Sequence, residues 1–203
     1  MAANLKGFYR WPEEKLHSFK RTLWFMEKWK WCSTLYSIDR DGTIGGDASV
    51  TYPGAFKLYP FAKEALELAK RYNIPLFAFS NQPGISKGEC TLQAFEDELL
   101  SFGFREVYIC PHSHTENCSC RKPSPEMLLT ASQTYQLNRK NCVVIGDRWS
   151  DMLAASQAGM QAILVKTGAG EEALGKYRHK WIDFEPMYTA KNLLDAMDWL
   201  LNK

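Results

Sequence analysis

The chain has 203 residues, which is close to the size of a single globular domain. Hydrophobic residues make up 45% and charged residues 24%, so the composition excludes a disordered, collagen-like or coiled-coil chain. The net charge of +2, from 25 Lys and Arg against 23 Asp and Glu, gives no reason to expect a nucleic-acid partner. Because the sequence lacks a leader-like start and an apolar run of about 18 residues, we expect a cytoplasmic protein without a membrane partner.

The segment before the first apolar run predicts an aromatic-rich helical extension over residues 1–33. Glu13 and Glu14 follow Pro12, in the order that a helix N-terminus favours. An apolar stripe at helical spacing comes next and consists of Leu16, Phe19, Leu23 and Met26. We expect this helix either to pack on the domain or to form a surface for a partner.

Five short apolar runs alternate with helical patterns in the rest of the chain. The predicted strands are residues 34–38, 74–80, 106–110, 142–146 and 161–165. Apolar residues recur at helical spacing after residue 61, after residue 91 and after Ser124-Pro125. This order predicts an α/β fold over residues 34–203, a three-layer doubly wound parallel sheet with helices on both faces. Ligands bind such sheets beyond the carboxyl ends of the strands, so we expect the functional residues there.

Two carboxylates, Asp39 and Asp41, follow the first predicted strand in the sequence D-R-D-G-T. A solvated acidic turn is the plain interpretation, but two acids leaving a buried strand require a partner. The spacing suits phosphoryl transfer through an aspartyl-phosphate, in which one carboxylate attacks phosphorus and the second handles the leaving group's proton. Gly42 lets the backbone come close to the phosphate.

Neutral and basic side chains follow the next two strands. Ser80 and Asn81 offer a hydroxyl and an amide after the second strand, where phosphate oxygens need donors. Arg121 and Lys122 follow the third strand and so border the same edge, although a solvated basic pair is the alternative. At this edge Lys122 would neutralise charge on the nucleophile and the phosphoryl group, and Arg121 would bind substrate.

Acids after the fourth strand predict a magnesium site. Asp147 could complete a site begun by Asp39 and the backbone carbonyl of Asp41, because Mg²⁺ prefers oxygen ligands. Asp151 is either a further acid of this site or an acid that the dipole of a following helix favours. Arg148 flanks the motif, and we expect it at the rim of the site together with Arg40 and Arg121, where a second anionic group of the substrate could bind.

A cluster of cysteines and histidines lies directly before Arg121. Cys110, Cys118 and Cys120 supply three thiolates, and either His112 or His114 supplies an imidazole. Four such ligands fill a tetrahedral zinc shell and leave no place for a reacting water, so we predict a structural Zn²⁺ site.

The motifs D-R-D-G-T, S-N-Q-P-G-I, C-R-K-P and G-D-R-x-x-D, each after a strand, resemble the haloacid-dehalogenase (HAD) superfamily of magnesium-dependent phosphatases over residues 34–170. The loop CPHSHTENCSCRKP is similar to the zinc-bearing branch that includes heptose bisphosphate phosphatase and histidinol-phosphate phosphatase. The C-x-H spacing of that branch favours His112 over His114. The resemblance implies that the nucleophile is Asp39, that the acid-base is Asp41, that Ser80 and Lys122 hold the phosphoryl group, that Arg121 binds substrate, and that magnesium lies on Asp39, Asp41 and Asp147.

Superfamily members often carry a cap domain, but only seventeen residues separate Thr43 from the helix near Phe61, so we expect a capless fold with an open site. We expect a monomeric magnesium- and zinc-containing phosphatase that hydrolyses a small phosphate ester. A heptose bisphosphate is the expected substrate and histidinol phosphate the alternative. SNQPGISKG and VKTGAG resemble the heptose enzymes, whereas the five residues between His112 and Cys118 resemble the histidinol enzymes. A catalytically idle zinc-containing binding module is the alternative from another class.

Overall fold

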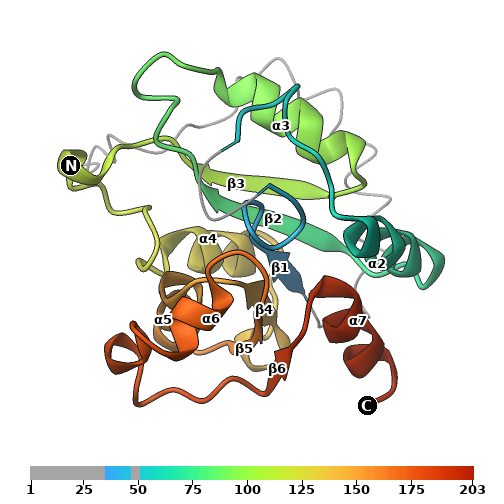
Figure 1. Ribbon diagram of the computed structural model, residues 1–203. Helices are drawn as coiled ribbons and strands as arrows, with labels where there is room; N and C mark the ends of the chain where they lie inside the picture. The colour runs from blue at the N-terminus through green and yellow to red at the C-terminus, as the bar shows by residue number, and fades with distance from the viewer. Residues whose placement is uncertain (1–34, 47–50) are drawn as a thin grey trace. The chain divides into compact units, whose positions relative to one another are not determined.

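The computed structural model describes residues 35–46 and 51–203, so the extension predicted over residues 1–33 lies outside the described residues. The described chain forms a six-stranded, fully parallel sheet in the order β3-β2-β1-β4-β5-β6 (Figure 1). The strands are β1 (Tyr36–Ile38), β2 (Leu76–Asn81), β3 (Glu106–Cys110), β4 (Val143–Gly146), β5 (Gln161–Val165) and β6 (Tyr188–Ala190).

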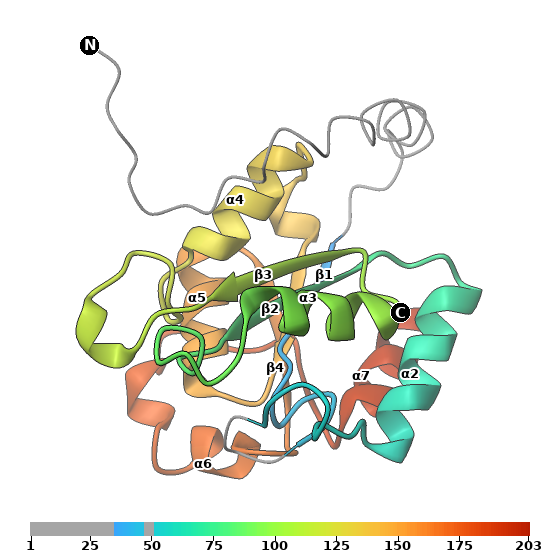
Figure 2. The same cartoon turned by 90° about the horizontal axis from the view of Figure 1, so that it is seen from above.

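Helices cover both faces of the sheet, as Figures 1 and 2 show. The helices are α2 (Pro60–Arg71), α3 (Leu92–Ser101), α4 (Glu126–Thr134), α5 (Trp149–Ala158), α6 (Gly170–Leu174) and α7 (Leu193–Leu201). One apolar cluster joins α2, α3 and α7 to one face of the strands, and a second joins α4 and α5 to the other face. The predicted three-layer doubly wound fold is therefore confirmed.

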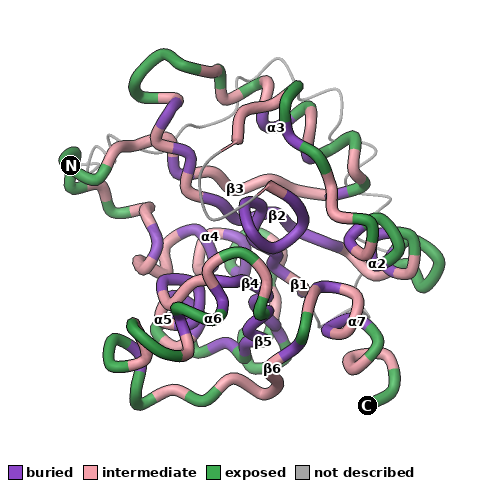
Figure 3. Tube along the Cα trace, viewed as in Figure 1, coloured by how far each residue is buried: buried purple, intermediate pink, exposed green. Residues whose placement is uncertain are grey.

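The central strands are buried from both sides (Figure 3). Successive residues of β4 belong to opposite clusters, with Val143 and Ile145 in the first and Val144 in the second. This explains why the strand is a continuous apolar run in the sequence. Within the described ranges, no helix has the length and apolar character needed to cross a bilayer.

Strand order brings the ends of β1, β2 and β4 together. Strand β1 lies between β2 and β4, and Ile38 is in register with Ala78 on one side and Ile145 on the other. The chain runs outward from β1 through β2 to β3 and then returns to β4 on the other side of β1. The carboxyl ends of β1 and β4 are therefore the topological switch point of the sheet. The residues directly after Ile38 and Ile145 therefore lie side by side at the carboxyl end of the sheet.

The structure adds elements that the sequence pattern did not predict. The three-residue strand β6 adds to the sheet beside β5, and the helix α7 packs beside α2 on one face of the sheet. No cap domain interrupts the described residues: the chain between β2 and β3 holds α3, and the segment after β1 folds back through bridges from Gly45 to Asp41 and to Leu58.

Adjacent leucines on α3 test this packing. Leu99 is fully buried, whereas Leu100 is 44% exposed. Leu99→Ala should lower the free energy of unfolding by about 2–5 kcal/mol, because it removes apolar contacts and leaves a cavity. Leu100→Ala should change it by less than about 0.5 kcal/mol, and urea unfolding of both variants provides the measurement. Equal losses would contradict the assignment of the buried face of α3.

Candidate active site

Three buried carboxylates meet at the switch point. Asp39 follows β1, Asp147 follows β4, and Asp151 lies in the first turn of α5. One oxygen of each lies within 4.8 Å of the others, and all three residues are buried. Like charges this close repel one another in a dry site, so the cluster requires positive charge.

Lys122 supplies part of that charge. Its Nζ lies 2.8 Å from Asp39 Oδ1 and 2.7 Å from Asp151 Oδ1, and it donates a hydrogen bond to the Phe79 carbonyl at 3.1 Å. Burial alone would lower the pKa of Lys122, but the carboxylates of Asp151 and Asp39 outweigh it and hold the pKa above its ordinary value. The lysine therefore stays protonated beside Asp39.

Asn81 holds the backbone of Lys122 in place. Its side-chain Nδ2 donates to the Lys122 carbonyl at 3.3 Å, and its Oδ1 accepts from the Lys122 amide at 3.0 Å. We predicted Asn81 as a substrate-binding residue, but in this structure its amide group is engaged with the chain that presents the lysine.

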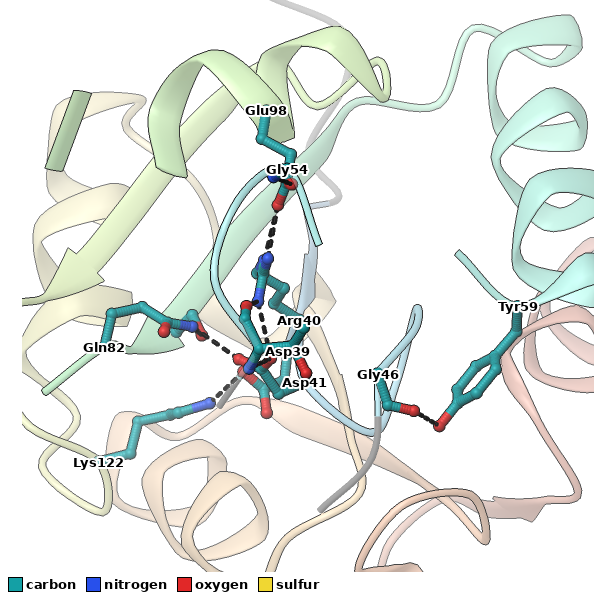
Figure 4. Close-up of polar contacts among 11 residues, drawn as sticks. Asp39, Arg40, Asp41, Gly46, Gly54, Tyr59, Gln82, Glu98 and Lys122 are labelled. Carbon is teal, nitrogen blue, oxygen red and sulfur yellow. Dashed lines mark hydrogen bonds and ion pairs between the residues drawn. The ribbon is translucent and has the colours of Figure 1, made fainter. Parts of the chain in front are cut away.

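Asp41 is held through both carboxylate oxygens (Figure 4). Oδ1 accepts from Arg40 Nη1 at 2.7 Å and from the Thr51 amide at 3.2 Å, while Oδ2 accepts from Gln82 Nε2 at 2.7 Å. Burial raises the pKa of Asp41, and Arg40 opposes that rise. A carboxyl group with a raised pKa can carry a proton at neutral pH more readily than an ordinary aspartate.

Gln82 is a site residue that the sequence analysis missed. Its Nε2 donates both to Asp41 and to Ser80 Oγ, at 2.8 Å, and so joins the ends of β1 and β2. The available signal was its place as the third polar residue of the S-N-Q motif.

Arg40 is not at the rim of the site, which corrects our expectation. It is fully buried, and its guanidinium pairs with Asp41 and with Glu98 on α3. Its charge is therefore already compensated inside the protein. As a fully buried side chain, Arg40 is not accessible to a second anionic group of a substrate.

Asp147 lies in a cradle that two glycines keep open. Its Oδ1 accepts from Thr43 Oγ1 at 3.2 Å and its Oδ2 from the Ala169 amide at 2.7 Å. A Cβ at either Gly42 or Gly168 would lie 2.3 Å from Asp147 Oδ2, and both glycines have positive φ. Only glycine fits at these two positions.

The donor set at the switch point suits a divalent cation. Burial raises the pKa of Asp147 well above its usual range, and the charges of Asp39 and Asp151 raise it further. Lys122 pairs with two of the three carboxylates and leaves Asp147 uncompensated by it. Carboxylate oxygens with surplus negative charge are the ligands that Mg²⁺ prefers, so these residues fit the predicted magnesium.

Asp151 caps α5 and also pairs with Lys122. Its Oδ2 accepts from the Arg148 amide at 2.9 Å at the start of the helix, while Oδ1 faces Lys122. Burial lowers the pKa of Arg148, but the Asp147 and Asp39 carboxylates raise it more, so the half-buried Arg148 stays charged near the acid cluster. Asp151 therefore caps the helix, as one of the two interpretations predicted, and it also belongs to the acid cluster.

The cysteine cluster has the dimensions of a zinc shell. Cys110 Sγ lies 3.5 Å from Cys118 Sγ and 3.7 Å from His112 Nδ1, and Cys120 Sγ lies 3.3 Å from His112 Nδ1 and 3.7 Å from Cys118 Sγ. Tetrahedral Zn²⁺ with bonds of about 2.3 Å to sulfur places two sulfur atoms about 3.8 Å apart. These residues therefore fit the predicted metal.

His114 lies outside that shell and contacts Arg121. Arg121 Nη2 lies 3.0 Å from His114 Nε2, and Arg121 Nη1 donates to the His112 carbonyl at 2.9 Å. Arginine is always a donor, so the Nε2 of His114 accepts this hydrogen bond. The loop that carries the Cys and His cluster thus orients Arg121, which we predicted to bind substrate.

Comparisons with known proteins identify relatives of this chain. A model of the HAD-hydrolase-like family matches residues 119–196. A D-glycero-beta-D-manno-heptose-1,7-bisphosphate 7-phosphatase of Helicobacter pylori (strain J99) is 33% identical over 174 residues, which cover 80% of this chain and 94% of that protein. The histidine biosynthesis bifunctional protein HisB of Campylobacter jejuni subsp. jejuni is 32% identical over 139 residues, covering 62% of this chain and 40% of that protein.

Solved structures show the same relationship. The D,D-heptose 1,7-bisphosphate phosphatase from B. bronchiseptica, complexed with magnesium and phosphate, superposes with a TM-score of 0.72 at 25% identity. The match covers 83% of this chain and 98% of that chain.

Two glycines with similar backbones test the cradle around Asp147. Gly168 (φ +54°) contacts Asp147, whereas nothing lies within 4 Å of a Cβ at Gly159 (φ +69°). Gly159→Ala should lose about 1–2 kcal/mol of stability from the left-handed backbone, and Gly168→Ala should lose more, because its Cβ would also lie 2.5 Å from Gly42 Cα. Only Gly168→Ala should also slow p-nitrophenyl phosphate hydrolysis, by about ten- to a hundredfold, because it displaces a carboxylate of the site. Equal rates in the two variants would show that Asp147 does not need its observed position.

Proposed function

The chain belongs to the HAD-like hydrolases and is a phosphoric monoester hydrolase, and we propose that it is a cytoplasmic heptose 1,7-bisphosphate 7-phosphatase that works through an aspartyl-phosphate on Asp39. The observation that carries this proposal is the meeting of Asp39, Asp41, Lys122 and Asp147 at the switch point of the sheet. Membership in a family of phosphatases favours an enzyme over an idle binding module.

Asp39 is the proposed nucleophile. Attack of its carboxylate on phosphorus forms the bond from the Asp39 oxygen to phosphorus and breaks the bond from phosphorus to the sugar oxygen. Lys122, 2.8 Å from Asp39 Oδ1, orients the carboxylate and offsets negative charge that collects as the phosphate approaches. Ser80, buried beside Gln82, offers a hydroxyl donor to the phosphoryl oxygens.

Asp41 is the proposed acid and base. It gives a proton to the departing sugar oxygen in the first step, and in the second step it takes a proton from the water that attacks the aspartyl-phosphate. Its raised pKa supports the first of these roles, because a carboxyl group must be protonated to act as an acid.

Asp39, Asp147 and the backbone carbonyl of Asp41 are the proposed holders of Mg²⁺, which supplies charge stabilisation for the phosphoryl oxygens. The surplus negative charge around Asp147 supports this assignment. The magnesium bound in the B. bronchiseptica phosphatase supports it as well.

The zinc ligands are proposed to be Cys110, His112, Cys118 and Cys120, with a structural role. Free thiols at zinc-like distances fit a protein of the cytoplasm, where cysteines remain reduced. The cluster ends at Cys120, directly before Arg121 and Lys122, so it determines where these two side chains begin.

A sugar bisphosphate is favoured over histidinol phosphate as the substrate. The match to the heptose bisphosphatase from H. pylori covers 80% of this chain, whereas the match to the bifunctional HisB protein covers 62% of it. The half-buried Arg121 and Arg148 supply positive charge near the site, which suits a second anionic group better than a cationic amine.

A comparison of two substrates tests the proposal. Heptose 1,7-bisphosphate should be cleaved with a higher kcat/KM than histidinol phosphate, and Arg121→Ala should narrow the difference by raising KM for the bisphosphate. Asp39→Asn should abolish turnover of both substrates and serves as the control for the mechanism. Equal or better turnover of histidinol phosphate would overturn the substrate assignment, and activity in Asp39→Asn would overturn the aspartyl-phosphate.

Replacement of a single thiol tests the zinc assignment. Metal analysis of the purified protein should find about one zinc per chain, as expected for a closed four-ligand site. Cys118→Ser should lose the zinc and lower activity about tenfold or more through misplacement of Arg121 and Lys122. Cys90 is a free cysteine outside the cluster, so Cys90→Ser is the matched control and should keep both the zinc and the activity. Full activity without zinc would contradict the structural role.

A further inference from the structure

The pair formed by Arg40 and Glu98 joins the active-site loop to a helix 58 residues away (Figure 4). Arg40 is fully buried, and the side chain of Glu98 is 11% exposed. Glu98 Oε1 accepts from Arg40 Nε at 3.1 Å and from Nη2 at 2.5 Å. A carboxylate that binds this edge of a planar guanidinium prevents the group from rotating.

The opposite edge of the guanidinium faces Asp41. Arg40 Nη1 donates to Asp41 Oδ1 at 2.7 Å and to the Thr51 carbonyl at 2.7 Å. The guanidinium carbon lies 3.6 Å from the centre of the Phe56 ring and 5.0 Å from that of Phe95, so aromatic faces fix its plane. The rotation of the Arg40 guanidinium and the orientation of its plane are therefore both restricted.

The same pair also holds the loop beside Asp41. Glu98 Oε2 accepts from the Gly54 amide at 3.3 Å, and the Thr51 amide donates to Asp41 Oδ1 at 3.2 Å. Loss of Glu98 would therefore release one side of the guanidinium and one anchor of the loop that contacts the acid.

We infer that Glu98, acting through Arg40, is a positioning residue that orients the Asp41 carboxyl group toward the leaving group. The inference rests on the acid role proposed for Asp41. Glu98 bonds Arg40 and Arg40 bonds the Asp41 carboxylate, so the effect of Glu98 passes through the direction in which Asp41 points.

The nature of the leaving group separates this role from a structural one. An alkoxide is a poor leaving group and needs the proton of Asp41, whereas p-nitrophenolate departs without protonation. The ratio kcat/KM reports the steps up to departure of the alcohol, so it excludes the later hydrolysis of the aspartyl-phosphate. A misdirected Asp41 must therefore lower kcat/KM for a sugar phosphate more than for p-nitrophenyl phosphate, while general loss of structure lowers both by the same factor.

Substitutions at Glu98 provide the test. Glu98→Ala should lower kcat/KM for heptose 1,7-bisphosphate about tenfold, which is part of the roughly hundredfold or larger effect of a general acid. The same variant should keep kcat/KM for p-nitrophenyl phosphate within about twofold of the wild-type value. Glu98→Gln keeps an oxygen acceptor for Arg40 but loses the oxygen that accepts from the Gly54 amide, so it should restore part of the loss. Asp97→Ala, an exposed acid on the same helix, is the matched control and should behave as wild type.

A variant on the other side of the pair covers the case in which Glu98→Ala does not fold. Arg40→Lys keeps the positive charge but cannot reach Asp41 and Glu98 at once, so it should show the same selective loss on the sugar phosphate. Equal losses on both substrates, or none, would overturn the inference.

Asp41→Asn separates this inference from the proposed function. It should show the substrate-dependent loss in full, on the order of a hundredfold or more for the sugar phosphate. If Asp41→Asn shows no such dependence, the acid role itself is wrong; if it does and the Glu98 and Arg40 variants do not, only the positioning role is wrong.

Discussion

The buried contact of Lys122 with Asp39 and Asp151 is the interaction on which the rest of the described structure depends. It joins the chain after β3 to the ends of β1 and the start of α5, across the switch point of the sheet. Removing one partner of such a pair typically costs about 3–5 kcal/mol, because a charge is left buried without compensation. The same contact orients the carboxylate of Asp39, the candidate nucleophile. One ion-pair cluster therefore stabilises the carboxyl end of the sheet and also sets the geometry of the site.

Two further devices bring Lys122 to that position. The Asn81 amide bonds both the N–H and the carbonyl of Lys122, which ties the lysine to the end of β2. The Cys and His cluster closes at Cys120 and shapes the loop that leads back from β3. The backbone of Lys122 is thus held by Asn81 and by the Cys and His cluster. Less conformational entropy is therefore lost when the charged side chain makes its contacts.

The sequence predicts residues whose roles follow from local position and fails where distant contacts decide. The acids after β1 and β4 were predictable because each motif directly follows a buried strand, and parallel strands end at one edge. Arg40 was misplaced because arginine is ordinarily exposed, and its burial depends on Glu98 and on Phe56 and Phe95 from other segments. Strand β6, of three residues, is too short to carry a periodic signal and forms because β5 offers it an edge.

Burial of Arg40 changes where specificity for an anionic substrate can arise. Without a cap, positive charge must come from the rim, and the expected set of three arginines is reduced to Arg121 and Arg148. Arg121 is already oriented by the His112 carbonyl and His114 Nε2, so the proposed binding of an anion would cost it little side-chain entropy. Because His112 also belongs to the Cys and His cluster, the orientation of the Arg121 side chain is coupled to the geometry of that cluster. The same cluster precedes Lys122, so the orientation of the Asp39 carboxylate depends on it as well, through the contact with Lys122.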